Sequence, residues 1–255
     1  MNLKIGLDMG STFIKAAFVD GEELIWRGLA PTAPGQESLA SRLIQEGRKA
    51  LGLPDGFAFL VASTGYGRNL FQAADLKVDE ITAGAIGAFK RSGGVARNVL
   101  NIGGQDMKAL RLSECGKIVD FKMNDKCAAG TGRFFELAAR VLDTALESFG
   151  ALSYLAQEDL EINSTCVVFA ESEIISLMAR GAKRESIIKA LHVSVARRAV
   201  GLLGREAMAA HLWLDGGPAQ NTGLIAAFED ELLAEVRALP EPLYTVAYGA
   251  AVSLT

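Results

Sequence analysis

The sequence predicts an α/β protein of two lobes, in which each lobe is a mixed sheet flanked by helices. Its 255 residues accommodate two lobes of roughly 100 to 150 residues each. A strand, glycine turn, strand pattern occurs twice, and between the copies and after them lie segments with helical spacing. A break in the pattern at residues 91–94 predicts a first lobe over 1–93 and a second over 94–244. A last helix, at 245–255, is expected to return to the first lobe.

The first copy runs through Leu3, Ile5 and Leu7, breaks at residues 9–12 and resumes at Ile14. The second copy, residues 100–109, aligns with residues 7–16 without a gap, and Leu, Gly, Lys and Ala are identical in the two copies. A third glycine turn, at 214–218, follows an apolar segment and predicts a strand, then a turn, then a helix from Ala219. These repeats indicate a strand hairpin in each lobe and one further turn in the second.

Six segments carry apolar residues at three-and-four spacing, which predicts helices. They are residues 37–51, 133–149, 169–180, 186–203, 219–233 and 245–254. The second lobe is therefore expected to be rich in helices.

Composition excludes several classes of function. The formal net charge is -4 at a pI near 5.4, and this gives no basic field for nucleic acid. No apolar run reaches the roughly 18 residues of a membrane span, and the chain enters its first strand at once, so we expect a cytoplasmic protein without a membrane partner. The three cysteines, Cys115, Cys127 and Cys166, are odd in number and widely spaced. Reduced thiols or metal ligands fit this usage better than disulfides.

The two hairpin turns have the chemistry of phosphate-binding loops. Glycine allows the backbone to approach a ligand closely, and consecutive N–H groups attract an anion. Two carboxylates, Asp8 and Asp106, can hold Mg²⁺ through its waters. The residues predicted to bind nucleotide at the two turns are Gly10, Ser11, Thr12 and Lys15, and Gly103, Gly104 and Gln105. Gln105 either orients the attacking water or binds the γ-phosphate.

The third turn offers a flat backbone surface for a base and ribose. Its predicted cofactor-binding residues are Gly216, Gly217, Pro218 and Asn221. The alternative is that each glycine turn only closes a strand connection. The order of the three turns resembles that of the actin-like ATPase superfamily, in which two hairpins hold the phosphates and a Gly-Gly turn holds the adenosine. That superfamily also contains kinases and chaperones, so the fold by itself does not choose the chemistry.

Cys127 and Cys166 each stand shortly before a predicted helix. A helix N-terminus stabilises a thiolate or an anionic cluster. A cubane iron–sulfur cluster takes four thiolates, and two copies of the chain would supply four. The alternative is that both are small buried apolar residues. Cys115, between Glu114 and Gly116, is expected to be an incidental thiol in an exposed hairpin.

Five stretches resemble the activator component of 2-hydroxyacyl-CoA dehydratases, a family that includes the benzoyl-CoA reductase ATPase subunits. They are residues 64–68, 102–106, 124–136, 166–173 and 216–221. The resemblance implies a homodimer with one 4Fe-4S cluster at its interface, ligated by Cys127 and Cys166 of both subunits. It also implies that ATP binding and hydrolysis drive a low-potential electron into a partner metalloprotein, and that the protein is oxygen-sensitive.

The identity of the partner stays open at this point. The acceptor is a 2-hydroxyacyl-CoA dehydratase or a double-cubane-cluster reductase, and the family implies reduced ferredoxin or flavodoxin as donor. A small-molecule kinase and a chaperone-like regulatory ATPase are the alternatives from other classes. For His192 and His211 we expect structural roles, and to residues 64–68 we assign no site.

Overall fold

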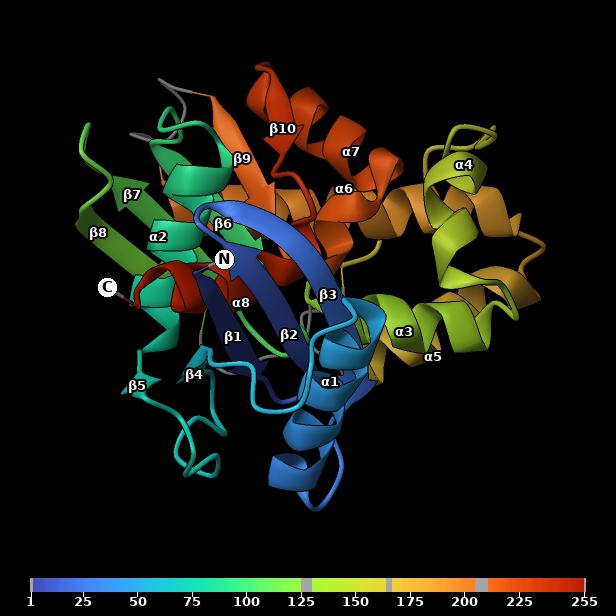
Figure 1. Ribbon diagram of the computed structural model, residues 1–255. Coiled ribbons are helices and arrows are strands. Elements are labelled where there is room, and N and C mark those ends of the chain that lie inside the picture. The colour runs from blue at the N-terminus through green and yellow to red at the C-terminus, as the bar shows by residue number, and fades with distance from the viewer. Residues whose placement is uncertain (1, 125–129, 164–166, 205–210, 255) are drawn as a thin grey trace. The chain divides into compact units, whose positions relative to one another are not determined.

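The computed structural model describes residues 2–124, 130–163, 167–204 and 211–254 (Figure 1). The chain divides into two compact units. Unit 1 consists of Met1–Ala96, Leu112–Ile118 and Leu243–Thr255, and unit 2 of Arg97–Arg111 and Val119–Pro242. Each unit contains a five-stranded sheet.

The sheet of unit 1 has the strand order β3-β2-β1-β4-β5. Its strands are β1 (Leu3–Met9), β2 (Phe13–Asp20), β3 (Glu23–Pro31), β4 (Leu60–Thr64) and β5 (Leu76–Lys77). The first three form an antiparallel meander, and β4 and β5 continue the sheet in parallel from β1. This confirms the predicted hairpin of the first copy.

Helices cover both faces of this sheet because its central strands are apolar on both sides. One face packs on α1 (Gln36–Ala50), and the other on α8 (Thr245–Val252), which lies beside α2 (Glu80–Arg91) (Figure 1). In β2 the alternation is clear, since Ile14, Ala16 and Phe18 join the core under α1 while Ala17 and Val19 join the core under α8.

The sheet of unit 2 repeats this topology. Its order is β10-β9-β6-β7-β8, with β6 (Asn98–Ile102), β7 (Met107–Leu112), β8 (Ile118–Met123), β9 (Leu212–Asp215) and β10 (Val236–Ala238). Strand β6 pairs antiparallel with β7 and parallel with β9, as β1 does with β2 and β4. The internal repeat in the sequence is therefore a repeat of structure, with β6, β7 and β9 equivalent to β1, β2 and β4.

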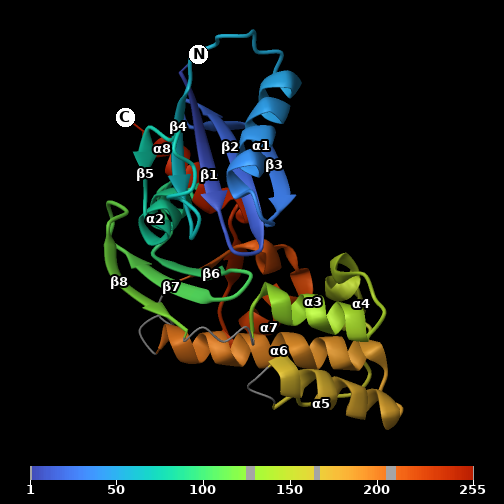
Figure 2. The same cartoon turned by 90° about the horizontal axis from the view of Figure 1, so that it is seen from below.

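A single large apolar core joins one face of this second sheet to the helices of unit 2. Those helices are α3 (Gly132–Val141), α4 (Phe149–Ser153), α5 (Val167–Ala179), α6 (Arg184–Leu203) and α7 (Thr222–Leu232), with short 3-10 turns at Leu146–Ser148 and Gly217–Gln220. A further 3-10 turn, Pro242–Tyr244, lies where the chain passes from unit 2 to unit 1. Helix α3 contacts α5, which in turn contacts α6, and Figure 2 shows the three helices running roughly parallel to one another.

The helix predicted over 133–149 is wrong beyond Val141. Leu142 ends α3, Asp143 adopts a left-handed φ of 47° and Ala145 is extended. A left-handed residue cannot continue a right-handed helix. The apolar spacing resumes at Phe149 because a separate short helix begins there.

Two further helix assignments differ from the prediction. The helix expected from Ala219 begins at Thr222, because the Asn221 side chain accepts hydrogen bonds from the N–H groups of Gly223 and Leu224 and so caps α7. Helix α2 was not predicted, since glycines within it lower helix propensity. One of these, Gly87, packs directly against the backbone of Thr245 at the start of α8, where a larger residue has no room.

Candidate functional site

The first predicted phosphate turn is a closed hairpin between β1 and β2. Gly10 N–H donates to the Phe13 carbonyl at 3.1 Å, which closes the turn. Thr32, just after β3, fastens it further, because its hydroxyl donates to the Gly10 carbonyl at 2.8 Å and its N–H to the Thr12 carbonyl at 2.9 Å. Ser11 lies between these anchored residues and is partly exposed.

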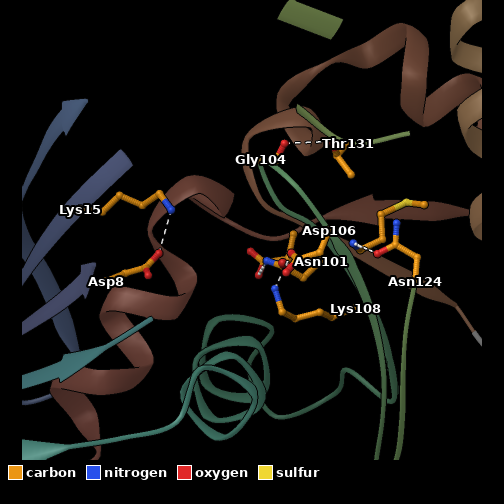
Figure 3. Close-up of polar contacts among 10 residues, drawn as sticks. Asp8, Lys15, Asn101, Gly104, Asp106, Lys108, Asn124 and Thr131 are labelled. Carbon is orange, nitrogen blue, oxygen red and sulfur yellow. Dashed lines mark hydrogen bonds and ion pairs between the residues drawn. The ribbon is translucent and has the colours of Figure 1, made fainter. Parts of the chain in front are cut away.

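Asp8 and Lys15 form an ion pair at the base of this turn. They are register partners on β1 and β2, and Lys15 Nζ lies 2.7 Å from Asp8 Oδ2 (Figure 3). Asp8 is buried, at 3% exposed. Its second oxygen, Oδ1, and the Thr12 hydroxyl are buried without a hydrogen-bond partner among the described residues. Such atoms fit a ligand that supplies the missing partners.

The second predicted phosphate turn, between β6 and β7, has the same construction. Gly103 N–H donates to the Asp106 carbonyl at 2.9 Å. Asp106 is buried, whereas Gly103, Gly104 and Gln105 are partly exposed. The structure thus presents the glycines and the predicted water-orienting glutamine at the tip of the hairpin, above the carboxylate.

Beneath this turn lies a buried polar network. Lys108 Nζ lies 2.6 Å from Asp106 Oδ1, and Asn101 Nδ2 donates to Asp215 Oδ2 at 2.7 Å (Figure 3). All four residues are less than 9% exposed. Lys108 occupies the repeat position of Lys15, so each phosphate turn has an ion pair of lysine and aspartate.

The second turn is also hydrogen-bonded to the start of α3. The N–H groups of Gly132 and Arg133 donate to the carbonyls of Gly103 and Gly104 at 2.8 and 3.1 Å. The Thr131 hydroxyl donates to the Gly104 carbonyl at 2.9 Å (Figure 3). The first turn of α3 thus directs its free N–H groups at the backbone of the phosphate turn.

On the other side of residues 125–129, Asn124 is anchored to the same hairpin. Its side-chain Oδ1 accepts from Met107 N–H at 2.7 Å, and its own N–H donates to the Met107 carbonyl at 3.1 Å. The segment 125–129 is therefore bracketed by hydrogen bonds to one hairpin. Cys127 and Cys166 lie outside the described residues.

Cys115 lies in the exposed turn between β7 and β8, as predicted. Its Sγ lies 3.2 Å from the Ser113 hydroxyl, and this contact holds the pKa of the Cys115 thiol below its usual value. A single exposed thiol on a hairpin does not make a metal site.

The third turn, predicted to bind adenosine, connects β9 to α7. Gly216 has a left-handed φ of 90°, and its N–H donates to the Pro242 carbonyl at 3.0 Å. Gly217 and Pro218 begin the 3-10 turn that follows. Gly216 has no room for a side chain, because a Cβ there would overlap the backbone of Ile102.

Asn221 follows this turn and is held by both ends of its amide. Because Oδ1 caps α7, Nδ2 faces His192 Nε2 at 2.9 Å and donates to it. His192 is buried, and burial lowers its pKa to about 4. His192 therefore has the structural role expected of it, and the described contacts of Asn221 are internal.

The carboxylates fit a hydrated magnesium ion better than a direct protein cage. Within the described ranges there is no group of three or more His, Cys, Asp or Glu side chains arranged to hold a metal ion. Mg²⁺ usually keeps several waters and takes one or two carboxylates plus substrate phosphates. Asp8, with one buried oxygen that has no hydrogen-bond partner among the described residues, has the capacity to accept from such a water. Over the same ranges, no helix is long and apolar enough to cross a membrane.

A family model described as the BadF/BadG/BcrA/BcrD ATPase family matches residues 5–253. The chain belongs to this family. It is an ATPase by that membership, and the resemblance to dehydratase activators noted in the sequence is confirmed.

One relative of this ATPase is the activator of lactoyl-CoA dehydratase from Anaerotignum propionicum, which is 40% identical over 97% of this chain and 95% of that protein. Among solved structures, the activator of 2-hydroxyisocaproyl-CoA dehydratase from Clostridium difficile with bound ADPNP is similar with a TM-score of 0.92. It is 35% identical, and the match covers 98% of this chain and 93% of the other.

The predicted actin-like fold is confirmed. A glucokinase of the ROK family from Streptomyces griseus, solved with glucose and AMPPNP, matches with a TM-score of 0.64 at 16% identity, over 99% of both chains. At this identity the likeness concerns the fold alone. The ATPase family and the kinases therefore share an architecture, and the chemistry has to come from the residues at the turns.

Three residues at the strand ends were not predicted as site residues. Lys108 was detectable, because it aligns with Lys15 in the internal repeat. Asp215 and Thr64 were not, since each meets its neighbour only through the pairing of strands that are far apart in sequence. Their positions beside Asn101 and Asp8 are consequences of the sheet.

Proposed function

We propose that this ATPase is an electron-transfer activator. ATP binding and hydrolysis drive an electron from a 4Fe-4S cluster, shared by two copies of the chain, into a partner metalloprotein such as a 2-hydroxyacyl-CoA dehydratase. The names of the two activators to which the chain is similar support this partner class. The distinct features of the chain that support it are the turns and the cysteines that follow them in the sequence.

The observation that carries the proposal is the attachment of the phosphate turn to both sides of the Cys127 segment. Gly103 and Gly104 accept from the first turn of α3, and Met107 holds Asn124. A displacement of the turn by a nucleotide phosphate must move these anchors, because hydrogen bonds of about 3 Å transmit position directly. The turn and the cysteine segment therefore respond to nucleotide together.

The cluster would be held by Cys127 and Cys166 of both subunits. Helices α3 and α5 begin at Gly132 and Val167, shortly after these cysteines, and they pack on each other. A helix N-terminus favours an anionic group, and each of these helices begins shortly after one cysteine, which fits a thiolate-bound cluster. When bound, the cluster would supply a low-potential electron to the partner.

The homodimer is supported by exposed apolar residues on α5. Phe169, Ile175 and Met178 are 67%, 53% and 43% exposed. Several large apolar side chains exposed on one helix favour an interaction surface. A second copy is the fitting occupant, because a cluster shared through Cys166 would bring two α5 helices together.

The nucleotide would be held by the three glycine turns. Backbone N–H groups at residues 10–12 and 103–104, with Lys15, would bind the phosphates. Asp8 and Asp106 would hold Mg²⁺ through its waters, and Gln105 would orient the attacking water. Residues 216–218 would provide the backbone surface for adenosine, with Asn221 fixing the position of that turn relative to α7.

The first test is the iron and acid-labile sulfide content of the anaerobically purified protein, with Cys127→Ala and Cys166→Ala as variants. We expect about four iron and four sulfide per dimer, lost in either variant. Cys115→Ala is the matched control, because Cys115 is exposed in a hairpin turn, and it should keep the full iron content. An iron-free protein after anaerobic reconstitution would contradict the proposal.

The second test is ATP-dependent reduction of a purified 2-hydroxyacyl-CoA dehydratase, with reduced ferredoxin or flavodoxin as donor. Reduction that requires ATP and both cysteines is the expected result. If only a double-cubane-cluster protein is reduced, the reductase is the partner instead of the dehydratase. ATP-dependent phosphorylation of a small molecule without electron transfer would favour a kinase.

A further inference from the structure

Thr64 ends β4 beside the carboxylate of the first phosphate turn. It is the parallel register partner of Asp8 on β1, so both side chains project from the same face of the sheet, one strand spacing apart. Thr64 is fully buried, and its hydroxyl has no hydrogen-bond partner among the described residues. The Oδ1 atom of Asp8, its register partner, is also buried without a hydrogen-bond partner among the described residues.

Two unsatisfied polar atoms side by side are costly. Each buried polar group without a partner costs on the order of 1–3 kcal/mol, and more when it is charged. Native structures keep such groups where a ligand or water completes them. Because the Thr64 hydroxyl and Asp8 Oδ1 are neighbours, one ligand can complete both.

Two glycines lie close to the Asp8 carboxylate. Gly65 follows Thr64 with a left-handed φ of 81°, and a Cβ on it would lie 2.7 Å from Asp8 Oδ1. A Cβ on Gly10 would lie 3.7 Å from the same oxygen and 3.7 Å from Lys15 Nζ. Any side chain at Gly65 would crowd the carboxylate oxygen, so the sequence keeps its surroundings free.

At the equivalent position in unit 2, the two side chains are hydrogen-bonded to each other. There Asn101 is the last residue but one of the central strand β6, as Asp8 is of β1, and its parallel partner on β9 is Asp215. Asn101 donates directly to Asp215 at 2.7 Å. In unit 1 the corresponding pair, Asp8 and Thr64, makes no such bond, and this difference indicates that the pair in unit 1 is arranged for a ligand.

We propose that the Thr64 hydroxyl, together with Asp8, binds a water of the hydrated magnesium ion that accompanies the nucleotide phosphates. The proposal rests on the function proposed above. A metal-bound water is a strong donor, and its two hydrogens allow a carboxylate and a hydroxyl to accept from it together. Thr64, the last residue of β4, is thus a further binding residue at a position that the sequence did not mark as a site.

The test is Mn²⁺ binding, followed by electron paramagnetic resonance, to the full-length dimer in the presence of ADP. Thr64→Val removes the hydroxyl at constant shape, and Thr64→Ser retains it. Ser63→Ala is the control, because the Ser63 hydroxyl on the opposite face donates to the Arg68 carbonyl at 2.9 Å. We expect Thr64→Val to weaken Mn²⁺ binding about tenfold, and both other variants to stay within about twofold.

Thermal unfolding separates a binding role from a structural one. Removing a buried hydroxyl without a protein partner should leave the Tm of the ligand-free protein unchanged or raise it. A lower Tm for Thr64→Val would indicate a structural hydrogen bond and overturn the proposal. ADP binding in EDTA should be the same in the wild type and in Thr64→Val, since the hydroxyl acts through the metal.

The outcomes also distinguish this inference from the proposed function. If the wild type binds Mn²⁺ with ADP and Thr64→Val binds it equally well, Thr64 has no role and the proposed function stands. If the wild type binds no nucleotide at all, both fail together.

Discussion

The Thr131 hydroxyl donates a hydrogen bond of 2.9 Å to the carbonyl of Gly104. Thr131 is fully buried and precedes α3 as its N-cap, yet its side chain bonds the phosphate turn instead of the helix. An N-cap Thr ordinarily accepts from its own helix. Here the position serves to attach the helix to the turn, and the coupling that we propose between nucleotide and the cysteine segment depends on this attachment.

Thr131→Val should therefore lower the number of electrons delivered per ATP more than it lowers the rate of ATP hydrolysis. Loss of the bond leaves the Gly104 carbonyl with fewer partners and costs about 1 kcal/mol of stability. We expect fewer electrons delivered to the partner per ATP hydrolysed, measured by parallel assays of phosphate release and partner reduction.

Thr144→Val is the matched control for this prediction. The Thr144 hydroxyl also donates to a backbone carbonyl, that of Leu142 at 2.8 Å, but beyond the far end of α3. This variant should lose similar stability and keep the wild-type ratio of electrons to ATP. Equal ratios in both variants would show that the Thr131 bond does not couple the two events.

Lys108→Met should destabilise the protein strongly. Lys108 and Asp106 are both buried and 2.6 Å apart, and removing one partner leaves a buried charge, which costs about 3 kcal/mol or more. Urea unfolding of the ligand-free protein measures the loss. Lys189→Met is the control, because Lys189 pairs with Asp159 at 2.8 Å on the surface, where breaking an ion pair has little effect.

Gly65→Ala should impair both stability and nucleotide binding. The φ of 81° strains any side chain, and the Cβ would lie 2.7 Å from Asp8 Oδ1 and 2.8 Å from the Met9 carbonyl. We expect a loss of about 2–3 kcal/mol in the free energy of unfolding, measured by urea denaturation, and weaker ATP binding by calorimetry.

Gly52→Ala provides the comparison for Gly65→Ala. Gly52 has a φ of 63° in open space, with nothing within 4 Å of a Cβ. In this variant the free energy of unfolding should fall only by the cost of the left-handed backbone conformation, about 1 kcal/mol, and ATP should bind normally. Equal losses at the two glycines would mean that the packing around Asp8 tolerates a methyl group.

The buried His192 should make stability depend on pH. Burial lowers its pKa from 6.5 to about 4, and the neutral ring accepts from the Asn221 amide. As the pH falls, His192 takes up a proton in the unfolded state before it does so in the folded state. The stability that the neutral, buried ring contributes is therefore complete above pH 6.5 and is lost as the pH falls toward 4. It amounts to about 3 kcal/mol over this range.

His192→Gln keeps a neutral acceptor and removes the titration. The free energy of unfolding of this variant, measured by urea denaturation at several pH values, should fall less steeply between pH 6.5 and 4 than that of the wild type. The same slope in both proteins would show that other groups set the acid stability.

Local features of the sequence predicted the hairpins. Alternating apolar residues with glycine between them determine a strand, a turn and a strand within about ten residues, and the repeat of this pattern predicted the second sheet. The family resemblance came from short motifs at the same turns. The same pattern could have predicted Lys108 as a site residue, because the repeat aligns it with Lys15.

The sequence by itself determined the turns, the chemical class of their ligand and the presence of most of the helices, though not all of their ends. Only the tertiary structure decided that α3 ends before the left-handed Asp143, and that Asn221 caps α7. It also decided that Thr64 lies beside Asp8 and that Asp215 bonds Asn101 across 114 residues. The physical reason is that periodicity records which face of an element is buried, whereas the partner of a buried polar group depends on which strand lies alongside.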